Sequence, residues 1–376
     1  MSVIIKEVIE KKDLKNFVRF NIELYKDCPY HVPGLIDEEM MTLDKNQNPA
    51  FETCDVVYFL AFKDNRIVGR IAGIINHKSN EVWNQKHARF GFVDFIDDPE
   101  VVDALFDAVE QWAKRKGMEH LHGPLGFTDL DHEGMLIEGF DQLGTMATIY
   151  NYPYYPVHME RMGFVKDNDW HEFKIYIPDS VPDKHLRVGE IVKTKYGLKT
   201  LKFKRRKDIW PYAHKIFKAL NSAFGPLYGF APLTEKQIDY YVNQYIPMIR
   251  LDMVTVIVKE ETDEVVGFGI SLPNLSGALK KAKGKMLPFG FIHLLKALKS
   301  KPKVIDLYLM GVLPEYQNKG VNALIFNDLI PIYQQLGVVY AESNPEMETN
   351  NAVQAQWDYF KREHHKTRRA FIKELK

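Results

Sequence analysis

A continuous apolar run over residues 304–310 is followed, after a short polar turn, by apolar positions at helical spacing over residues 323–330. These patterns predict a buried strand and then a helix. The turn between them contains Lys319 and Gly320. The first N–H groups of a helix have no intrahelical acceptor, and a glycine lets an anion approach the backbone closely. The pattern therefore predicts a phosphate-binding turn at the start of this helix.

The same order of elements occurs twice along the chain. Two apolar segments, at 56–62 and 67–74, flank a short polar turn and predict a β-hairpin. The segments 253–258 and 265–270 predict a second hairpin about 200 residues later. Each hairpin follows a strand and helices, precedes a long strand and a helix, and leads to a final strand, helix and strand. We therefore interpret the chain as two copies of one structural plan.

The boundary between the two copies is expected near residues 178–183, where prolines and polar residues interrupt both patterns. This predicts one domain at 1–178 and a second at 179–376. The alternative is a single large α/β domain, but each half already has the size of a typical domain.

The polar turn of the second half resembles a known motif. Val312, Pro314, Gln317 and Gly320 match the pattern V-x-P-x-x-[QR]-x-x-G-x-[GA] of the acyl-CoA pyrophosphate loop in the GNAT superfamily of N-acetyltransferases. Asn322 departs from it, because that position usually holds Gly or Ala. The alternative is a strand–turn–helix with an incidental glycine.

The order of the predicted elements also resembles that of the GNAT superfamily, over nearly the whole chain. The resemblance implies an α/β fold of two tandem GNAT-like domains, each with a central mixed, mostly antiparallel sheet flanked by helices.

The resemblance implies acetyl-CoA or another acyl-CoA as co-substrate. The implied cofactor-binding residues are Met310, Gly311 and Val312 at the strand end, Gln317, Asn318, Lys319, Gly320, Val321 and Asn322 in the turn, and Asn351 further on. A glycine inside a strand marks either close ligand approach or a simple β-bulge, and Gly311 is open to both interpretations.

The first half carries Asp97, Asp98 and Glu100 where the second half has its turn. These carboxylates suit a helix N-terminus but would repel a pyrophosphate. We therefore expect one cofactor site, in the second half.

Three residues are candidates for proton transfer. Tyr359 matches the tyrosine that protonates the leaving thiolate in the GNAT superfamily, and its alternative role is packing beside Trp357. Asp306 and Glu342, on or after predicted strands, are candidate general bases, although many such carboxylates are merely solvated.

The predicted function is therefore transfer of an acyl group, acetyl in the first instance, to the amine of a small molecule or a peptide. Two alternatives remain open. One is a non-catalytic descendant that binds CoA or acts as a scaffold, and the other is a Fem-type aminoacyl transferase.

Composition limits the possible partners, metal sites and location of the protein. Lys+Arg and Asp+Glu balance at 50 each, so nothing points to nucleic acid as a partner. The only cysteines, Cys28 and Cys54, give no disulfide framework or cysteine-rich metal site, so we expect no metal and a cytoplasmic protein. The most apolar stretch, 286–298, is too short for a membrane span.

Two further segments have open interpretations. A lysine-rich insertion at 277–303 contains eight lysines and no acid. It could be a substrate lid, an acyl-chain cover, or a contact for an acidic partner or a membrane surface; the alternative is a helix pair packed on the other domain. The aromatic cluster at 150–155 could line a cleft or pack a domain contact.

Overall fold

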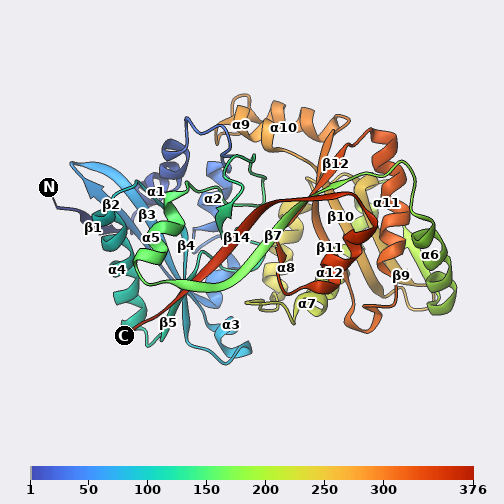
Figure 1. The fold of residues 1–376 in the computed structure, drawn as a ribbon, viewed down its shortest axis with the longest axis horizontal. Coiled ribbons are helices and arrows are strands. Elements are labelled where there is room, and N and C mark those ends of the chain that lie inside the picture. Colours follow the sequence, from blue (N-terminus) through green and yellow to red (C-terminus); the bar gives the residue numbers. More distant parts are fainter. Residues whose placement is uncertain (1) are drawn as a thin grey trace. The chain divides into compact units, whose positions relative to one another are not determined.

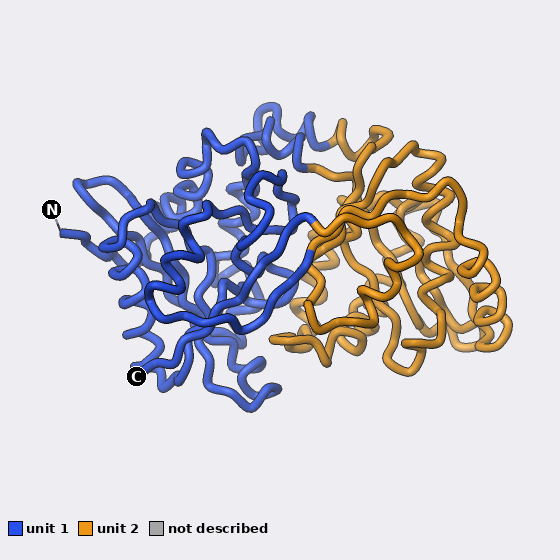
Figure 2. Tube along the Cα trace, viewed as in Figure 1, with its two compact units in different colours: residues 1–171, 276–294, 365–376 blue, residues 172–275, 295–364 orange. Residues whose placement is uncertain are grey.

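The computed structural model describes residues 2–376, and the chain divides into two compact units (Figure 2). Unit 1 holds the chain up to His171 together with residues 276–294 and 365–376, and unit 2 holds residues 172–275 and 295–364. Two segments from the second half of the sequence therefore pack in unit 1, including most of the lysine-rich insertion. The boundary near residue 178 stays a prediction about the order of the two copies along the chain.

Unit 1 is built on a sheet of strand order β1-β2-β3-β4-β5-β14, with β6 beside β14 (Figure 1). Only β4 and β5 run parallel. The strands are β1 (Ile4–Glu7), β2 (Cys54–Lys63), β3 (Arg66–Asn76), β4 (His87–Phe95), β5 (His120–Gly123), β6 (Met135–Glu138) and β14 (Arg362–Glu374). The helices are α1 (Lys11–Leu24), α2 (Ile36–Thr42), α3 (His77–Val82), α4 (Pro99–Arg115), α5 (Tyr154–Arg161) and α9 (Ser276–Ala282), with the short 3-10 turn η1 (Pro49–Glu52).

The side chains of β2 alternate between two separate hydrophobic cores, one on each face of the sheet. Val57 and Phe59 pack with α4, whereas Tyr58 and Leu60 pack with α1. Successive residues of a strand point to opposite faces, so this alternation buries both faces of the sheet under helices.

Unit 2 has the strand order β7-β12-β11-β10-β9-β8, in which only β11 and β12 run parallel. The strands are β7 (Val165–Tyr176), whose residues up to His171 belong to unit 1, β8 (Leu198–Leu201), β9 (Val254–Lys259), β10 (Val265–Pro273), β11 (Val304–Val312), β12 (Tyr340–Ser343) and the short β13 (Glu346–Met347). The helices are α6 (Asp183–Tyr196), α7 (Arg206–Phe224), α8 (Glu235–Tyr245), α10 (Gly290–Lys299), which begins in unit 1, α11 (Asn322–Leu336) and α12 (Asn351–Gln356), with 3-10 turns η2 (Leu251–Met253), η3 (Pro314–Tyr316) and η4 (Trp357–Tyr359).

Helices α7 and α11 contact the strands of unit 2 through small residues. A Cβ on Gly269 of β10 would lie 2.4 Å from Ile325 of α11. A Cβ on Gly311 of β11 would lie 3.5 Å from Ala223 of α7. Glycine at position 269 therefore lets α11 approach the sheet closely, whereas a Cβ at position 311 would be at ordinary contact distance from α7.

Both halves of the sequence follow the same order of elements, which confirms the expected mixed sheets flanked by helices. The last strand of each half, however, completes the sheet of the other unit. Residues 174–176 of β7 pair with β12 in unit 2, and residues 371–374 of β14 pair with β5 in unit 1. Each sheet therefore needs residues from both halves of the sequence.

No helix described between residues 2 and 376 combines the length and the apolar character needed to cross a membrane.

Candidate functional site

The turn between β11 and α11 holds a row of free backbone donors. Asn318 has a φ of 57° and Gly320 a φ of 80°, both in the left-handed region, and Val321 returns to right-handed geometry before α11 begins. Within residues 2–376, none of the N–H groups of residues 318–322 donates a hydrogen bond. Left-handed residues near a helix start allow successive N–H groups to converge on one anion.

Gly320 is required by two features of this turn. Its positive φ is unfavourable for residues with a Cβ. A Cβ there would also lie 2.4 Å from the Cγ1 atom of Val188 on α6. Helix α6 therefore packs directly beneath the turn and fixes its position.

Two polar side chains of the turn, Gln317 and Lys319, have distinct roles. Gln317 donates from Nε2 to the Val312 carbonyl at 3.1 Å, so it closes the turn on itself. Lys319 lies near the rings of Tyr196 and Tyr316, at 5.6 and 5.8 Å, and has no carboxylate partner in the described chain. Its positive charge is thus available beside the free N–H groups.

Asn322, the departure from the GNAT pattern, is half-buried and directs its side chain away from the turn. Its Nδ2 atom lies 3.5 Å from Oε1 of Gln356 at the end of α12. Asn351, the remaining predicted cofactor residue, is exposed at the start of α12, where the Asn350 side chain caps the helix.

The strands β11 and β12 separate just before the turn. Their parallel pairing covers only Val304 to Leu307 of β11, although β11 continues to Val312. The carbonyl of Tyr308 accepts a hydrogen bond from the Asn344 side chain instead of from a β12 backbone group. The backbone beyond Leu307 is therefore no longer paired with its parallel neighbour.

The β-bulge, which was the alternative interpretation of Gly311, lies at a neighbouring position. Ile270 of β10 pairs with Leu309 and Ser271 pairs with Leu307, which makes Tyr308 the extra residue. Gly311 is regular strand, and a Cβ there would lie 2.8 Å from the Phe268 ring. Its lack of a side chain thus has a packing reason, while Met310 packs against a cluster that contains Trp357.

Asp306 and Glu342 are partners in the register of β11 and β12, directly before the strands separate. Both side chains are buried. Asp306 accepts a hydrogen bond from Nδ2 of Asn274 at 2.7 Å. The structure therefore brings the two predicted carboxylates to one place in the sheet.

Tyr359 lies on η4, one turn beyond α12, and is 46% exposed. Its hydroxyl accepts a hydrogen bond from Lys184, and its ring meets the His185 ring edge-on at 5.2 Å. None of its contacts within the described chain is with Asp306 or Glu342. The three predicted proton-transfer residues thus do not form one hydrogen-bonded group.

Sequence reasoning missed Glu346. This residue lies on β13, just after β12 has separated from β11. Its Oε1 atom accepts the indole N–H of Trp357 at 2.7 Å, and its Oε2 atom is buried without a hydrogen-bond partner in the described chain. Burial raises the pKa of this carboxyl group to about 8, against a smaller lowering by the Trp357 hydrogen bond. Carboxylates with such pKa values often act as acids or bases.

The corresponding helix start in unit 1 is closed. At the beginning of α4, the Asp98 side chain accepts the N–H of Glu100, and the Asp98 backbone carbonyl accepts those of Val101 and Val102. Lys63 forms ion pairs with Asp98 at 2.7 Å and with Glu100 at 3.1 Å. The N–H groups at the start of α4 and the positive charge of Lys63 are thus already bound by acceptors within unit 1.

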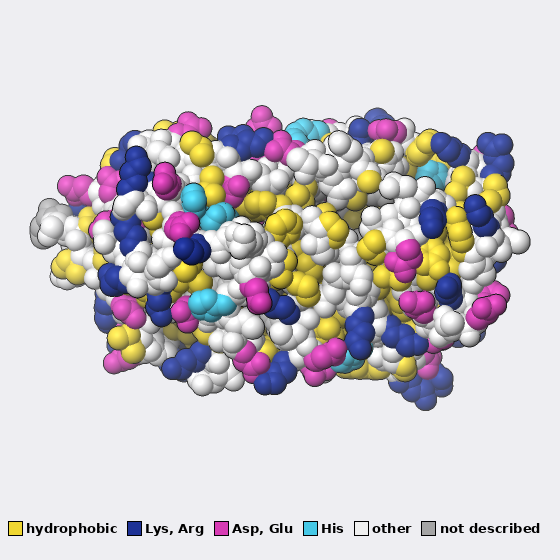
Figure 3. Space-filling view, turned by 90° about the horizontal axis from the view of Figure 1, so that it is seen from below, with side chains coloured by type: hydrophobic (Ala, Val, Ile, Leu, Met, Phe, Trp, Pro, Cys, Tyr) yellow, Lys and Arg dark blue, Asp and Glu magenta, His cyan; other side chains and the backbone are white. Residues whose placement is uncertain are grey.

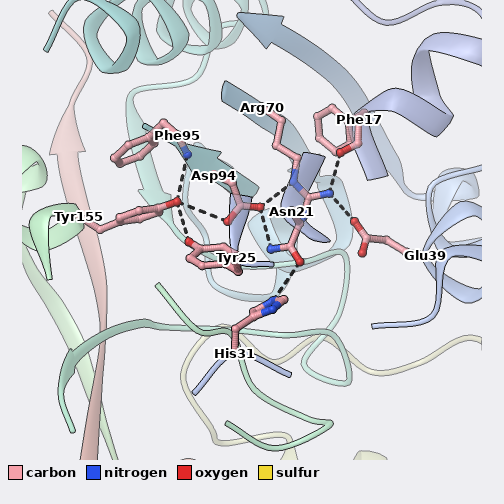
Figure 4. Close-up of polar contacts among 9 residues, drawn as sticks. All are labelled: Phe17, Asn21, Tyr25, His31, Glu39, Arg70, Asp94, Phe95 and Tyr155. Atoms are coloured by element: carbon pink, nitrogen blue, oxygen red, sulfur yellow. Dashed lines mark hydrogen bonds and ion pairs between the residues drawn. The ribbon is translucent and has the colours of Figure 1, made fainter. Parts of the chain in front are cut away.

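A second polar network is buried in unit 1 (Figure 4). Asp94 accepts hydrogen bonds from Nε of Arg70 at 2.7 Å and from Nδ2 of Asn21 at 3.0 Å. Arg70 also reaches Glu39, and the Tyr155 hydroxyl accepts from Tyr25 at 2.7 Å. These bonds tie α1, α2, β3, β4 and α5 together.

His31 completes this network as a neutral side chain. Its Nε2 atom lies 3.1 Å from the side-chain oxygen of Asn21, and its ring stacks on Tyr25 at 4.6 Å. Burial and then the charge of Arg70 lower the pKa of His31 to about 3. Because the groups satisfy one another, we assign this network to the stability of unit 1.

The aromatic cluster at 150–155 belongs to the same core. Tyr150 and Tyr155 are buried in it, and Tyr152 and Tyr154 pack against it while partly exposed. The Tyr152 ring lies 4.9 Å from that of Tyr25. These rings therefore fill the interior of unit 1.

Comparison with known proteins identifies relatives of this chain by sequence. No model of a known protein family matches it. Protein YghO of Escherichia coli is 30% identical over 86% of this chain and 82% of its own length. A protein of Caulobacter vibrioides called bacterial ceramide synthase is 29% identical over 81% of this chain and 79% of its own.

Among solved structures, a tandem GNAT protein from the clavulanic acid biosynthesis pathway matches 100% of this chain and 99% of its own, with a TM-score of 0.56 and 11% identity. This likeness establishes the fold. The chain thus has the tandem GNAT fold and belongs to the same protein family as protein YghO.

Proposed function

We propose that this protein is an acyl-CoA-dependent N-acyltransferase with one cofactor site, in unit 2. The observation that carries the proposal is the row of free N–H groups at residues 318–322 beside the uncompensated charge of Lys319. Backbone donors at a helix start, together with a lysine, suit a pyrophosphate. The start of α4 in unit 1, closed by Asp98, does not fit such a group.

The separation of β11 and β12 supports a place for the pantetheine arm. Backbone groups of Met310 to Val312 lie beyond the last parallel pair, so they can bind an extended ligand in the manner of an added strand. A pantetheine arm bound along these groups would extend from the pyrophosphate turn toward Glu346 and the α12–η4 segment.

Acyl transfer to an amine requires removal of a proton from the amine and return of a proton to the thiolate. We propose Glu346 as the base, because its carboxyl group is held near neutral pKa at the point of strand separation. Tyr359 is the proposed acid. Its hydroxyl is a hydrogen-bond donor, and Lys184 and His185 hold the ring in place. Asp306 and Glu342 remain alternative bases.

The acceptor is proposed from the relative called bacterial ceramide synthase. A ceramide is a sphingoid base that carries an acyl group on its amine, so we propose a long-chain amino alcohol as acceptor and a long-chain acyl-CoA as donor. This narrows the small-molecule amine expected from the sequence and replaces acetyl by a longer acyl chain. Both cysteines are free thiols, which supports a cytoplasmic location.

The test is turnover with palmitoyl-CoA and sphinganine, followed by mass spectrometry of the N-acyl product. Acetyl-CoA and a panel of polar amines serve as comparison substrates. We expect the N-acyl sphinganine as the main product. A product from acetyl-CoA and a polar amine alone would contradict the acceptor assignment. CoA binding without any product would favour the scaffold alternative, and activity only with an aminoacyl donor would favour the Fem-type alternative.

A further inference from the structure

A short stretch of chain, residues 285–299, exposes an unusual number of large apolar side chains. This stretch, which we call the lysine–apolar segment, contains the end of the loop after α9 and helix α10. Its exposed apolar residues are Leu287, Phe289, Phe291, Ile292 and Leu295, with Leu287 and Phe289 at 74% and 67% exposure. Exposed apolar residues gathered in one place mark an interaction site more often than single ones do.

Helix α10 presents these side chains away from its packed face. Gly290 and Leu294 are buried and lie on one side of the helix. At about 100° per residue, Phe291, Ile292 and Leu295 lie on the other side, together with Lys296 and Lys299. The outer face of α10 is therefore both apolar and positively charged.

The charge of this region has one sign only. Eight lysines and no acid occur between residues 277 and 303. The chain as a whole carries equal numbers of basic and acidic residues, and the face shown in Figure 3 mixes both kinds. The lysines of the segment consequently have no carboxylate nearby in the sequence to neutralise them.

The chain directly before the segment, residues 276–284, is firmly held in unit 1. Ala278, Leu279 and Ala282 of α9 are buried. The Gly284 carbonyl accepts the N–H of Ile36 at 2.9 Å, and Ser276 donates to the Gly144 carbonyl at 2.9 Å. The exposed apolar side chains thus follow directly on an anchored helix and are not needed for its packing.

We infer that the lysine–apolar segment binds the surface of an anionic lipid bilayer. In such binding, apolar side chains enter the boundary between headgroups and acyl chains, while lysines meet the anionic headgroups. The mixture of exposed phenylalanine, leucine and lysine on one short element matches this chemistry. The inference does not rest on the proposed function, since it requires neither acyl-CoA nor catalysis.

The test is sedimentation of the full chain with vesicles of phosphatidylcholine alone or with phosphatidylglycerol added. We expect binding to the anionic vesicles that weakens as salt is raised from about 0.1 M to about 1 M, because the Debye length falls from about 10 Å to about 3 Å. Equal binding to both kinds of vesicle, or none to either, would overturn the inference.

A triple variant, Phe289→Ser with Lys296→Gln and Lys299→Gln, localises the effect. Its matched control is Ile9→Ser with Lys11→Gln and Lys12→Gln, an exposed apolar residue and two exposed lysines in a segment that also contains acids. The triple variant should lose at least about tenfold in vesicle binding, since each lysine near an anionic surface contributes a factor of about five. The control should bind as the wild type does. Undiminished binding by the triple variant would overturn the inference, as would dimerisation through the segment in place of vesicle binding.

Discussion

Glu346 accepts the indole N–H of Trp357 at 2.7 Å while its other carboxylate oxygen is buried without a partner in the described chain. One hydrogen bond offsets only part of the cost of burying a carboxylate. The group therefore holds its proton to about pH 8 in the folded protein. This places a titrating group on β13, just after β12, where the proposed acceptor amine would bind.

The first prediction concerns the stability of the Glu346→Gln variant as a function of pH. The folded-state pKa is raised from 4.5 to about 8, so between these values the unfolded state binds fewer protons than the folded state. The contribution of Glu346 to stability is therefore fully present below pH 4.5 and is lost as pH rises to about 8. In denaturant unfolding, the free energy of unfolding of the variant should therefore rise relative to that of the wild type as pH increases over this range. A difference that does not change with pH would contradict the burial of this carboxylate.

The same residue should control the pH dependence of turnover. A base with this pKa predicts a kcat that rises with pH to a plateau above about pH 8. Glu346→Gln should remove that limb and lower kcat by about 10²–10⁴-fold. Glu342→Gln and Asp306→Asn are the comparison variants. If one of them, and not Glu346→Gln, abolishes the pH limb, the base is the residue it replaces.

Tyr359→Phe should lower kcat and leave acyl-CoA affinity nearly intact, because a proton donor acts mainly in the transition state. The expected loss is about 10²–10⁴-fold. The ring is kept, so the contacts with Lys184 and His185 should hold the fold unchanged. Tyr212→Phe, which removes a hydroxyl bonded to Asp263 at 2.9 Å, is the matched control. Equal turnover in both variants would show that Tyr359 only packs.

Gly320→Ala should destabilise unit 2 by about 1–3 kcal/mol through backbone strain and overpacking. Gly337→Ala separates the two causes. Its φ of 74° carries the same strain, but the nearest atom to a Cβ there lies 3.7 Å away. Gly320→Ala should therefore be more destabilising than Gly337→Ala. Adding Val188→Ala to Gly320→Ala should restore that extra free energy of unfolding, measured in urea. No recovery would mean that Val188 does not support the turn.

The hairpins and the strand–turn–helix were predictable because local signals determine them. Short apolar segments on either side of a polar turn mark β2 and β10, and the positive φ that Gly320 permits marks a turn. Glu346 gave no such signal, since its raised pKa comes from burial in the folded chain, and its hydrogen-bond partner Trp357 lies eleven residues further along the sequence. The position of the bulge at Tyr308 likewise depends on the register with β10.

The exchange of last strands could not be predicted for a related reason. The apolar pattern of β14 specifies which of its faces is buried but not which sheet it joins. Phe371 is buried in the core of unit 1, but its apolar side chain alone does not name that core. Only the three-dimensional arrangement shows that residues 371–374 pair with β5.

The most direct test of the central claim is a calorimetric titration of the protein with palmitoyl-CoA. The account predicts one site per chain, and it predicts that Lys319→Glu weakens binding strongly because it places a negative charge beside the donors of residues 318–322. Lys204→Glu reverses an exposed lysine elsewhere in unit 2 and should leave the affinity unchanged. Two sites per chain, or equal affinity in the Lys319→Glu and Lys204→Glu variants, would contradict a single acyl-CoA site at this turn.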